Sequence, residues 1–300
     1  MSDAPSPSAP APPGRPVRLV VNADDFGVSE RVNSGIVHAH REGVVTATSL
    51  MAVGRAFEHA VRLTRAVPDL DVGVHLTLVA ERPLRPEGRS LTGTDGRFPP
   101  GAGAFTLGWL TGRIRRADVE AEWSAQIERV LASGFRPSHL DSHQHVHVLP
   151  GLLDLARGLA SRYGIPFVRV PAEGWRLDRP ITLHGISRLL GAGILRVLAA
   201  VSSPWRAGRT GLRPPVFLGF HDGGRLDEQR LRSLLAGLRR GESYELMCHP
   251  GLTPEEEDLR RWGYGHEMEL QALTSPAVRA DLERLGVDLC TFKDLTSSNL

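Results

Sequence analysis

The chain has 300 residues, of which 41% are hydrophobic and 23% charged, with a formal net charge of +2 at pH 7. This length is enough for one barrel domain or two smaller domains, and the composition is that of an ordinary globular protein. With a net charge so close to zero, no large electrostatic field argues for nucleic acid or an anionic membrane as a partner. Two cysteines, Cys248 and Cys290, form neither a disulfide framework nor a CxxC metal site, so nothing requires an oxidising compartment. We predict a cytoplasmic protein.

The first sixteen residues, MSDAPSPSAPAPPGRP, are rich in proline, alanine and serine. They contain no apolar segment, so they match neither a signal peptide nor a membrane span, and they cannot bury enough surface to become ordered. We predict a disordered tail over residues 1–16 and a single domain over residues 17–300.

After the tail, short β-rich segments alternate with amphipathic helical segments, which is the pattern of a parallel α/β fold. Strands are predicted over residues 17–21, 46–53, 72–78, 139–142, 167–170, 216–220, 244–248 and 287–292. Helices are predicted after Ser29, over residues 57–67, after Asp118, over residues 152–163 and 226–238, and after Ser275. Residues 79–110 are rich in glycine and proline, so an irregular loop is expected there.

Residues 181–203 form a long apolar segment that His184, Arg188 and Arg196 interrupt. Each arginine at the centre of a bilayer costs about 2.5–3.5 kcal/mol on insertion scales, so this segment is not expected to span a membrane. Two alternatives stay open. The segment is either a helix packed on the domain or an interfacial helix that contacts a lipid-linked substrate.

Unusual polar residues gather at or near the carboxyl ends of the predicted strands. They are Asp24 and Asp25 after the first strand, His75 inside the third, Asp141, His143, His145 and His147 after the fourth, His221 and Asp222 after the sixth, and His249 after the seventh. In a (β/α) barrel these strand ends meet at one face, where active sites are built. We therefore expect residues far apart in the sequence to share one pocket.

These residue types suit a metal ion. Two imidazoles and one carboxylate leave coordination positions open for water and substrate, as a hydrolytic or redox site requires. A second carboxylate can accept a proton from water, and a histidine across the pocket can protonate a leaving amine. One full set is present: Asp24, Asp25, His75, His143 and His249.

Each of these residues taken alone has an ordinary structural explanation. An aspartate after a strand is more often a cap or turn residue, and a histidine in an apolar strand is usually a hydrogen-bonded core residue. The HxHxH segment is harder to explain. On a strand, the period of two puts His143, His145 and His147 on one face together with Asp141. Four polar groups there are costly to bury unless they bind something, so the combination predicts a metal site.

Four motifs, VNADDFGVS, GVHLTL, HLDSHQHVH and MCHPG, resemble in order and spacing those of the YdjC-like carbohydrate deacetylases, also called the ChbG/HpnK family. The resemblance covers about residues 17–292. It implies a distorted, TIM-like (β/α) barrel related to the polysaccharide deacetylases. The activity it implies is removal of the N-acetyl group from substrates that contain N-acetylglucosamine.

The resemblance also implies a role for each motif residue. Asp25, His75 and His143 are expected to bind the metal, with Asp24 as the catalytic base and His249 as the general acid. Three further residues are candidates for supporting or substrate-binding roles: Asp141, His147 and His221. Family members are associated with magnesium, whereas two imidazole ligands favour zinc or another transition metal. We therefore predict one divalent cation and leave its identity open.

The family divides over substrate, with one branch acting on chitooligosaccharides and another on N-acetylglucosaminyl hopanoid lipids. No motif decides between them, and residues 79–110 and 181–203 are where a lipid would be accommodated. The expected partner is an N-acetylated amino sugar or a glycolipid, with peripheral membrane contact at most. Two alternatives remain: another metal-dependent hydrolase or sugar isomerase on the same barrel, or a catalytically inactive glycan-binding protein. Asp24 and His249 favour an enzyme, since pure binding needs neither base nor acid.

Overall fold

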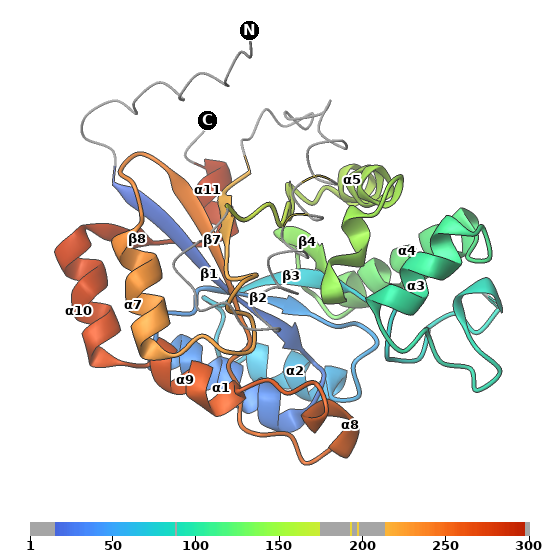
Figure 1. Cartoon of the computed structure of the whole chain (residues 1–300), viewed down its shortest axis with the longest axis horizontal. Helices are drawn as coiled ribbons and strands as arrows, with labels where there is room; N and C mark the ends of the chain where they lie inside the picture. The colour runs from blue at the N-terminus through green and yellow to red at the C-terminus, as the bar shows by residue number, and fades with distance from the viewer. Residues whose placement is uncertain (1–15, 88, 175–192, 194–196, 198–213, 298–300) are drawn as a thin grey trace, which may run out of the picture.

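The computed structural model describes residues 16–87, 89–174, 193, 197 and 214–297. Figure 1 shows a curled sheet in the middle of this part of the chain, with helices around it. The strands are β1 (Val17–Phe26), β2 (Ala47–Leu50), β3 (Asp71–Leu76), β4 (His139–Ser142), β5 (Phe167–Val168), β6 (Val216–Leu218), β7 (Ser243–Cys248) and β8 (Val287–Leu289). The α-helices are α1 (Glu30–Arg41), α2 (Phe57–Thr64), α3 (Ala102–Leu110), α4 (Arg116–Ala132), α5 (Leu152–Tyr163), α7 (Glu228–Ala236), α8 (Glu257–Arg260), α9 (His266–Leu273), α10 (Pro276–Leu285) and α11 (Phe292–Ser297).

The paired strands all run parallel, in the order β5-β4-β3-β2-β1-β7-β6, and β8 pairs with the beginning of β1. β1 is central: Asn22 aligns with Ala47 of β2 on one side and with Met247 of β7 on the other. The described strands therefore form a curled half-barrel. This confirms the predicted distorted (β/α) barrel.

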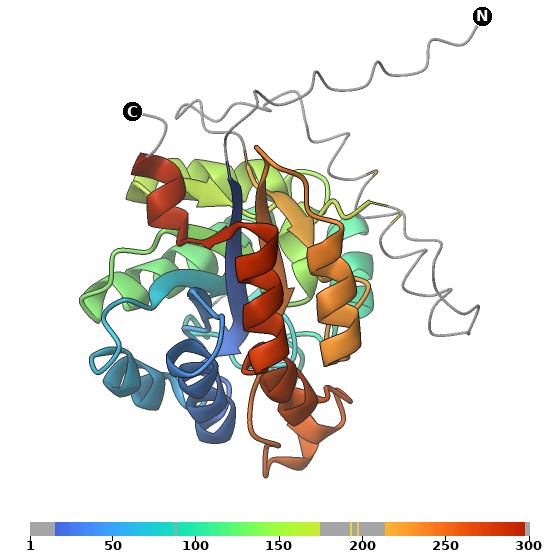
Figure 2. The same ribbon diagram turned by 90° about the vertical axis from the view of Figure 1, so that its left-hand side faces the viewer.

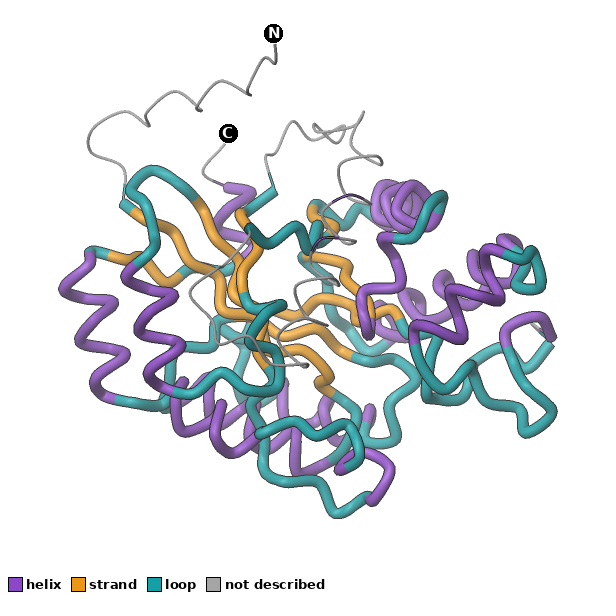
Figure 3. Tube along the Cα trace, viewed as in Figure 1, coloured by secondary structure: helices purple, strands orange, loops and turns teal. Residues whose placement is uncertain are grey.

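Because β1 lies in the middle of the sheet, it is buried on both faces. Leu19, Val20 and Val21 are at most 1% exposed, and a parallel strand covered on both faces has a continuous apolar sequence of this kind. The neighbouring helix α1 begins as predicted, because the Ser29 side chain accepts a hydrogen bond from the Val32 backbone. Figure 2 shows α7 and α10 side by side along one side of the sheet, and Figure 3 shows the strands enclosed by helices.

The structure corrects the prediction for residues 79–110 and the helix that follows. This segment is not wholly irregular, because it contains α3. Asp118 does not cap the next helix: α4 begins at Arg116, two residues earlier. The Asp118 carboxylate instead accepts hydrogen bonds from the Ser90 backbone and hydroxyl, at 3.3 and 2.6 Å. A contact from the short 3₁₀ helix Arg89–Leu91 thus satisfies a side chain that sequence alone assigned to a cap.

Two predicted boundaries near the ends of the sheet are also wrong. The predicted strand over residues 287–292 stops at Leu289, because the Asp294 carboxylate accepts hydrogen bonds from both the backbone and the hydroxyl of Thr291 and so starts α11. The first strand extends beyond its predicted end at residue 21. Asp24 and Asp25 therefore belong to β1 itself and not to a turn after it.

Two predicted segments lie outside the described residues: the tail, apart from Pro16, and the apolar segment 181–203, apart from residues 193 and 197. In the described part of the chain, no helix combines the length and apolar character that a membrane span requires.

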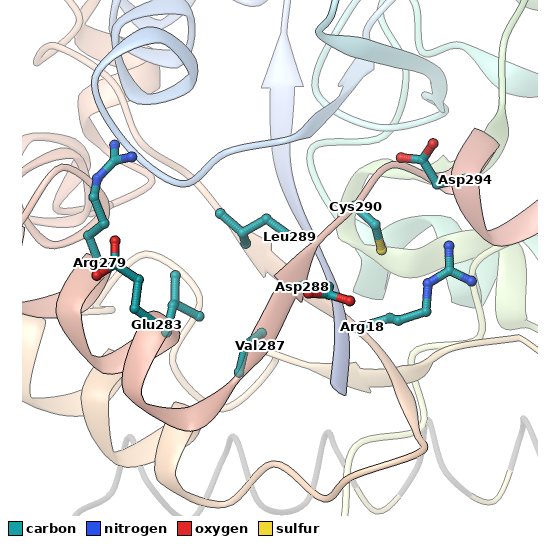
Figure 4. A pocket seen from close by; sticks show the side chains of 9 residues that line it. Arg18, Arg279, Glu283, Val287, Asp288, Leu289, Cys290 and Asp294 are labelled. Carbon is teal, nitrogen blue, oxygen red and sulfur yellow. The ribbon is translucent and has the colours of Figure 1, made fainter. Parts of the chain in front are cut away.

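A cavity of about 470 Å³ opens beside the beginning of β1 (Figure 4). Arg18, Arg279, Glu283 and Asp288 line it, together with other residues of β8 and α10. Arg18 stands near the start of β1 and Asp24 near its end, so the cavity lies at the opposite end of the strand from the aspartates. The residues predicted from the sequence to form the active site lie at the other end of the sheet.

Candidate metal centre and active site

Asp25, His75 and His143 meet at the carboxyl ends of β1, β3 and β4. Asp25 Oδ1 lies 3.3 Å from His75 Nε2 and accepts a 2.9 Å hydrogen bond from His143 Nδ1. One ligand atom from each of the three residues lies within 4.8 Å of the others, and all three side chains are buried. The structure thus brings together the three residues predicted to bind a metal.

A break in the strand pattern allows both adjacent aspartates to face this site. In a regular strand, consecutive side chains point to opposite faces. Asp25, however, adopts a left-handed backbone conformation with φ of 66°, and the register between β1 and β2 shifts between Ala23 and Phe26. Such bulges redirect side chains and are frequent next to active sites. As a result Asp25 reaches His143 while Asp24 reaches a neighbouring cluster in the same site.

The triad has the chemistry of a cation site. Asp25 Oδ2 and His143 Nε2 are buried and have no hydrogen-bond partner among the described residues, which is rare for buried polar atoms. Burial alone would raise the pKa of Asp25, but the charge of His143 and hydrogen bonds from His143 and His75 hold it well below its ordinary value. An ionised carboxylate beside two imidazoles fits a divalent cation.

Asp141 orients the His75 imidazole by a hydrogen bond from the ring nitrogen that faces away from Asp25. Its Oδ1 accepts a 2.8 Å hydrogen bond from His75 Nδ1, so His75 Nε2 is left facing Asp25. Carboxylates placed in this way fix the orientation of metal-binding imidazoles. Burial lowers the pKa of His75, but Asp141 outweighs it and the pKa rises to about 10. The position of Asp141 therefore favours a supporting role over substrate contact.

Arg169, directly after β5, links three buried carboxylates. Its Nη1 donates to Asp24 Oδ2 at 2.6 Å and lies 2.8 Å from Asp141 Oδ2, while Nη2 donates to Asp24 Oδ1 at 2.7 Å. Its Nε donates to Glu245 of β7 at 2.6 Å. Buried charges are retained only when they are paired in this way. One guanidinium group therefore fixes Asp24 and Asp141 relative to each other.

His249 follows β7 and faces the triad, with its Nε2 4.0 Å from Asp25 Oδ2. Its backbone is held twice, since the amide donates to Glu269 Oε2 and the carbonyl accepts a 2.9 Å hydrogen bond from His266 Nδ1. Burial lowers the pKa of His249 to about 4. The free protein therefore holds a neutral imidazole at this edge of the site.

The expectation that His143, His145 and His147 share a strand face is wrong. β4 ends at Ser142, and residues His143–Val148 turn in a 3₁₀ segment. Within it, Gln144 and His145 have left-handed backbone angles, with φ of 54° and 55°. The segment curls away from the strand direction, so only His143 of the three reaches the triad.

The other predicted histidines have different surroundings. His147 Nδ1 accepts a hydrogen bond from Ser142 Oγ, and its Nε2 donates to the Arg169 carbonyl at 2.9 Å. His147 therefore holds the backbone of Arg169 in place. The backbone amide of His221 donates to Glu173 at 3.0 Å, and His221 belongs to neither of the two groups of potential metal ligands among the described residues.

Comparison with known proteins agrees with the motifs. The family model described as YdjC-like protein matches residues 18–284. The chain belongs to this family. A carbohydrate deacetylase of Geobacillus stearothermophilus is 34% identical over 280 residues, which cover 93% of this chain and 98% of that protein. A carbohydrate deacetylase of Homo sapiens is 35% identical over 302 residues, with coverage of 94% and 92%.

A crystal structure from Enterococcus faecalis V583 has the same fold as this YdjC-like protein. It belongs to a candidate cellobiose-phosphate cleavage protein, and the two chains superpose with a TM-score of 0.72 at 27% identity. The superposition covers 93% of this chain and 99% of the other. The resemblance predicted from the four motifs is confirmed.

Sequence reasoning missed two charged residues of this YdjC-like site, Arg169 and Glu245. Both stand in apolar surroundings, FVRV and YELMC, that predicted buried strands. A charged residue in such a strand is almost never buried unless it is paired. That signal was present in the sequence, but the identity of the partners became visible only when β1, β5 and β7 were placed together.

Proposed function

We propose that the chain is a metal-dependent hydrolase that removes the N-acetyl group from a substrate containing N-acetylglucosamine. The observation that carries this proposal is the presence in one site of a metal-binding triad and of two groups suited to proton transfer, Asp24 and His249. Relatives that are named carbohydrate deacetylases and align over nearly the whole chain support the same reaction class.

Asp25, His75 and His143 would hold one divalent cation. When bound, such a cation polarises a carbonyl group and lowers the pKa of a water molecule. A second group, Asp24, His75 and Asp141, also has ligand-like spacing, but both of its carboxylates are already paired with Arg169. We therefore propose one ion per chain and not two. The donor set favours zinc or another transition metal, and the family resemblance implies magnesium.

The chain's own groups supply the proton transfers. Asp24 accepts the proton of the attacking water, and its carboxylate is kept in place by Arg169 and by a 2.8 Å hydrogen bond from Asn22 Nδ2. His249, which is neutral in the free protein, would first take up the proton that Asp24 removes from the water, and would then deliver it to the nitrogen as the bond between the acetyl carbon and that nitrogen breaks. The products are acetate and a sugar with a free amine.

Acetate release from N-acetylglucosamine, diacetylchitobiose and longer chitooligosaccharides tests the proposal. Protein treated with a chelator should release almost no acetate, and adding Mg²⁺, Zn²⁺, Mn²⁺ or Co²⁺ should restore release. Sugar binding without acetate release under every metal would identify a glycan-binding protein. Isomerised sugar with its acetyl group intact would identify an isomerase.

A glycolipid is the second candidate substrate, and α3 favours it. Leu107 and Leu110 are 57% and 66% exposed on this helix, and exposed Arg113 follows it. The Ala102 backbone at the start of α3 donates a 2.7 Å hydrogen bond to Gln144, the residue after His143, so the helix begins beside the site. Exposed leucines next to an arginine suit an anionic membrane surface. We keep the prediction of a cytoplasmic protein, with peripheral membrane contact through α3.

The double variant Leu107→Ser and Leu110→Ser tests this contact. We expect it to bind less well than wild-type protein to vesicles containing phosphatidylglycerol, since apolar area drives interfacial binding. Its activity on a short soluble amino sugar should be unchanged. Equal sedimentation of both proteins with vesicles would rule out α3 as the lipid contact.

A further inference from the structure

Two aromatic side chains border the candidate metal centre and have no part in the mechanism above. Trp262 and Tyr264 lie between α8 and α9, in a segment that Figures 1 and 2 place beside the carboxyl end of β1. The ring centroid of Trp262 is 4.8 Å from that of His143, and the ring centroid of Tyr264 is 4.5 Å from that of His249. Each aromatic ring therefore contacts one histidine of the site.

Both side chains are half-buried, unlike the fully buried Trp123 of the core. Their centroids are 5.9 Å apart and their planes are inclined at 66°. Because of this inclination, one flat ligand ring cannot stack on both. The two side chains therefore have different tasks. Trp262 presents a partly exposed ring next to a metal-binding residue, and Tyr264 covers His249.

The segment is held in place before any ligand binds. The Gly265 amide donates a 2.8 Å hydrogen bond to the Gly224 carbonyl. Gly224 has φ of 76°, and a Cβ atom there would lie 2.5 Å from the Tyr264 ring. Only glycine therefore allows the ring to lie against this loop.

A second anchor fixes the other end of the segment. Arg55, just before α2, pairs with Asp258 of α8 and lies 3.3 Å from Glu81, which is buried. The loop after β3, the start of α2 and α8 are thereby joined. Aromatic rings fixed in advance lose little freedom on binding, which favours ligand affinity.

We infer that Trp262 stacks on the pyranose ring that carries the N-acetyl group, and that Tyr264 positions the His249 imidazole. This inference rests on the proposed function. A pyranose ring has an apolar C–H face that matches an aromatic surface, while its hydroxyl groups stay at the edge with polar groups. Stacking beside His143 would place the acetyl group next to the triad. The ligand class is thus a neutral amino sugar, free or at the end of a longer molecule.

The first test measures the affinity for diacetylchitobiose by calorimetry in the Asp24→Asn background, where turnover does not interfere. Adding Trp262→Ala should weaken the affinity about 3–10-fold, the range expected for one aromatic contact, and Trp262→Phe should keep most of it. Metal content should not change. The matched control is Tyr163→Ala, which removes a half-buried aromatic residue from the end of α5.

Unchanged sugar affinity in Trp262→Ala, or the same loss in Tyr163→Ala, would overturn the stacking role. These affinities separate the inference from the proposed function, because wild-type protein that binds sugar through Trp262 but releases no acetate refutes only the function.

The second test addresses Tyr264 as a positioning residue. Tyr264→Ala should lower kcat about tenfold or more with a smaller change in KM, because His249 loses the ring beside it, and Tyr264→Phe should restore most of kcat. A loss confined to KM, or no rescue by phenylalanine, would overturn this role.

Discussion

The Asp24→Asn variant is expected to release acetate about 10²–10⁴-fold more slowly than wild-type protein, the usual contribution of general acid–base catalysis. Asparagine keeps the size of the side chain and one oxygen acceptor for Arg169, but it cannot take a proton from water. The protein should remain folded, because Arg169 still pairs with Asp141 and Glu245.

Steady-state acetate release, with and without excess metal, measures this effect. Excess metal should not rescue the variant, since the triad is intact. The matched control is Asp288→Asn, an exposed aspartate of β8 at the opposite end of the sheet, which should behave as wild type. Activity within a few-fold of wild type in Asp24→Asn would remove this residue from the mechanism.

Replacing Arg169 with alanine should lower the free energy of unfolding by about 3–5 kcal/mol, because it leaves buried carboxylates of Asp24, Asp141 and Glu245 without their cation. Arg169→Lys restores the charge but not the planar group of donors that reaches all three. We expect this variant to fold and to have a reduced kcat.

Denaturant unfolding of both variants measures the stability effect. Arg162→Ala is the control, because it removes an arginine whose ion pair with Glu120 is on the surface, and it should change stability much less. Wild-type stability in Arg169→Ala would show that the cluster does not depend on this residue.

Local sequence signals predicted much of the fold. Ser29 and Ser275 cap α1 and α10 as expected, because a cap needs only its own side chain and the next turn of backbone. Strand positions followed from apolar runs. Asp118 does not cap α4, because its carboxylate accepts hydrogen bonds from Ser90, which is distant in the sequence, and from the Arg115 side chain.

The sequence was enough to predict which residues form the site, but not how their side chains are arranged. Strand ends converge in any parallel barrel, which is why Asp25, His75 and His143 could be grouped in advance. The left-handed angle at Asp25 and the 3₁₀ turn after Ser142 break the period of two, and neither is visible in the residue pattern. Arg169 was missed because its three partners lie on other strands.

Metal content measured by elemental analysis, on wild-type protein, Asp24→Asn and Asp25→Asn after reconstitution and desalting, tests the central claim most directly. Wild-type protein and Asp24→Asn should each retain about one divalent ion per chain, since one open set of three ligands binds one ion. Asp25→Asn should lose most of its metal, and excess metal should restore part of its activity. An empty Asp24→Asn site beside a fully metallated Asp25→Asn site would contradict the assignment of both aspartates.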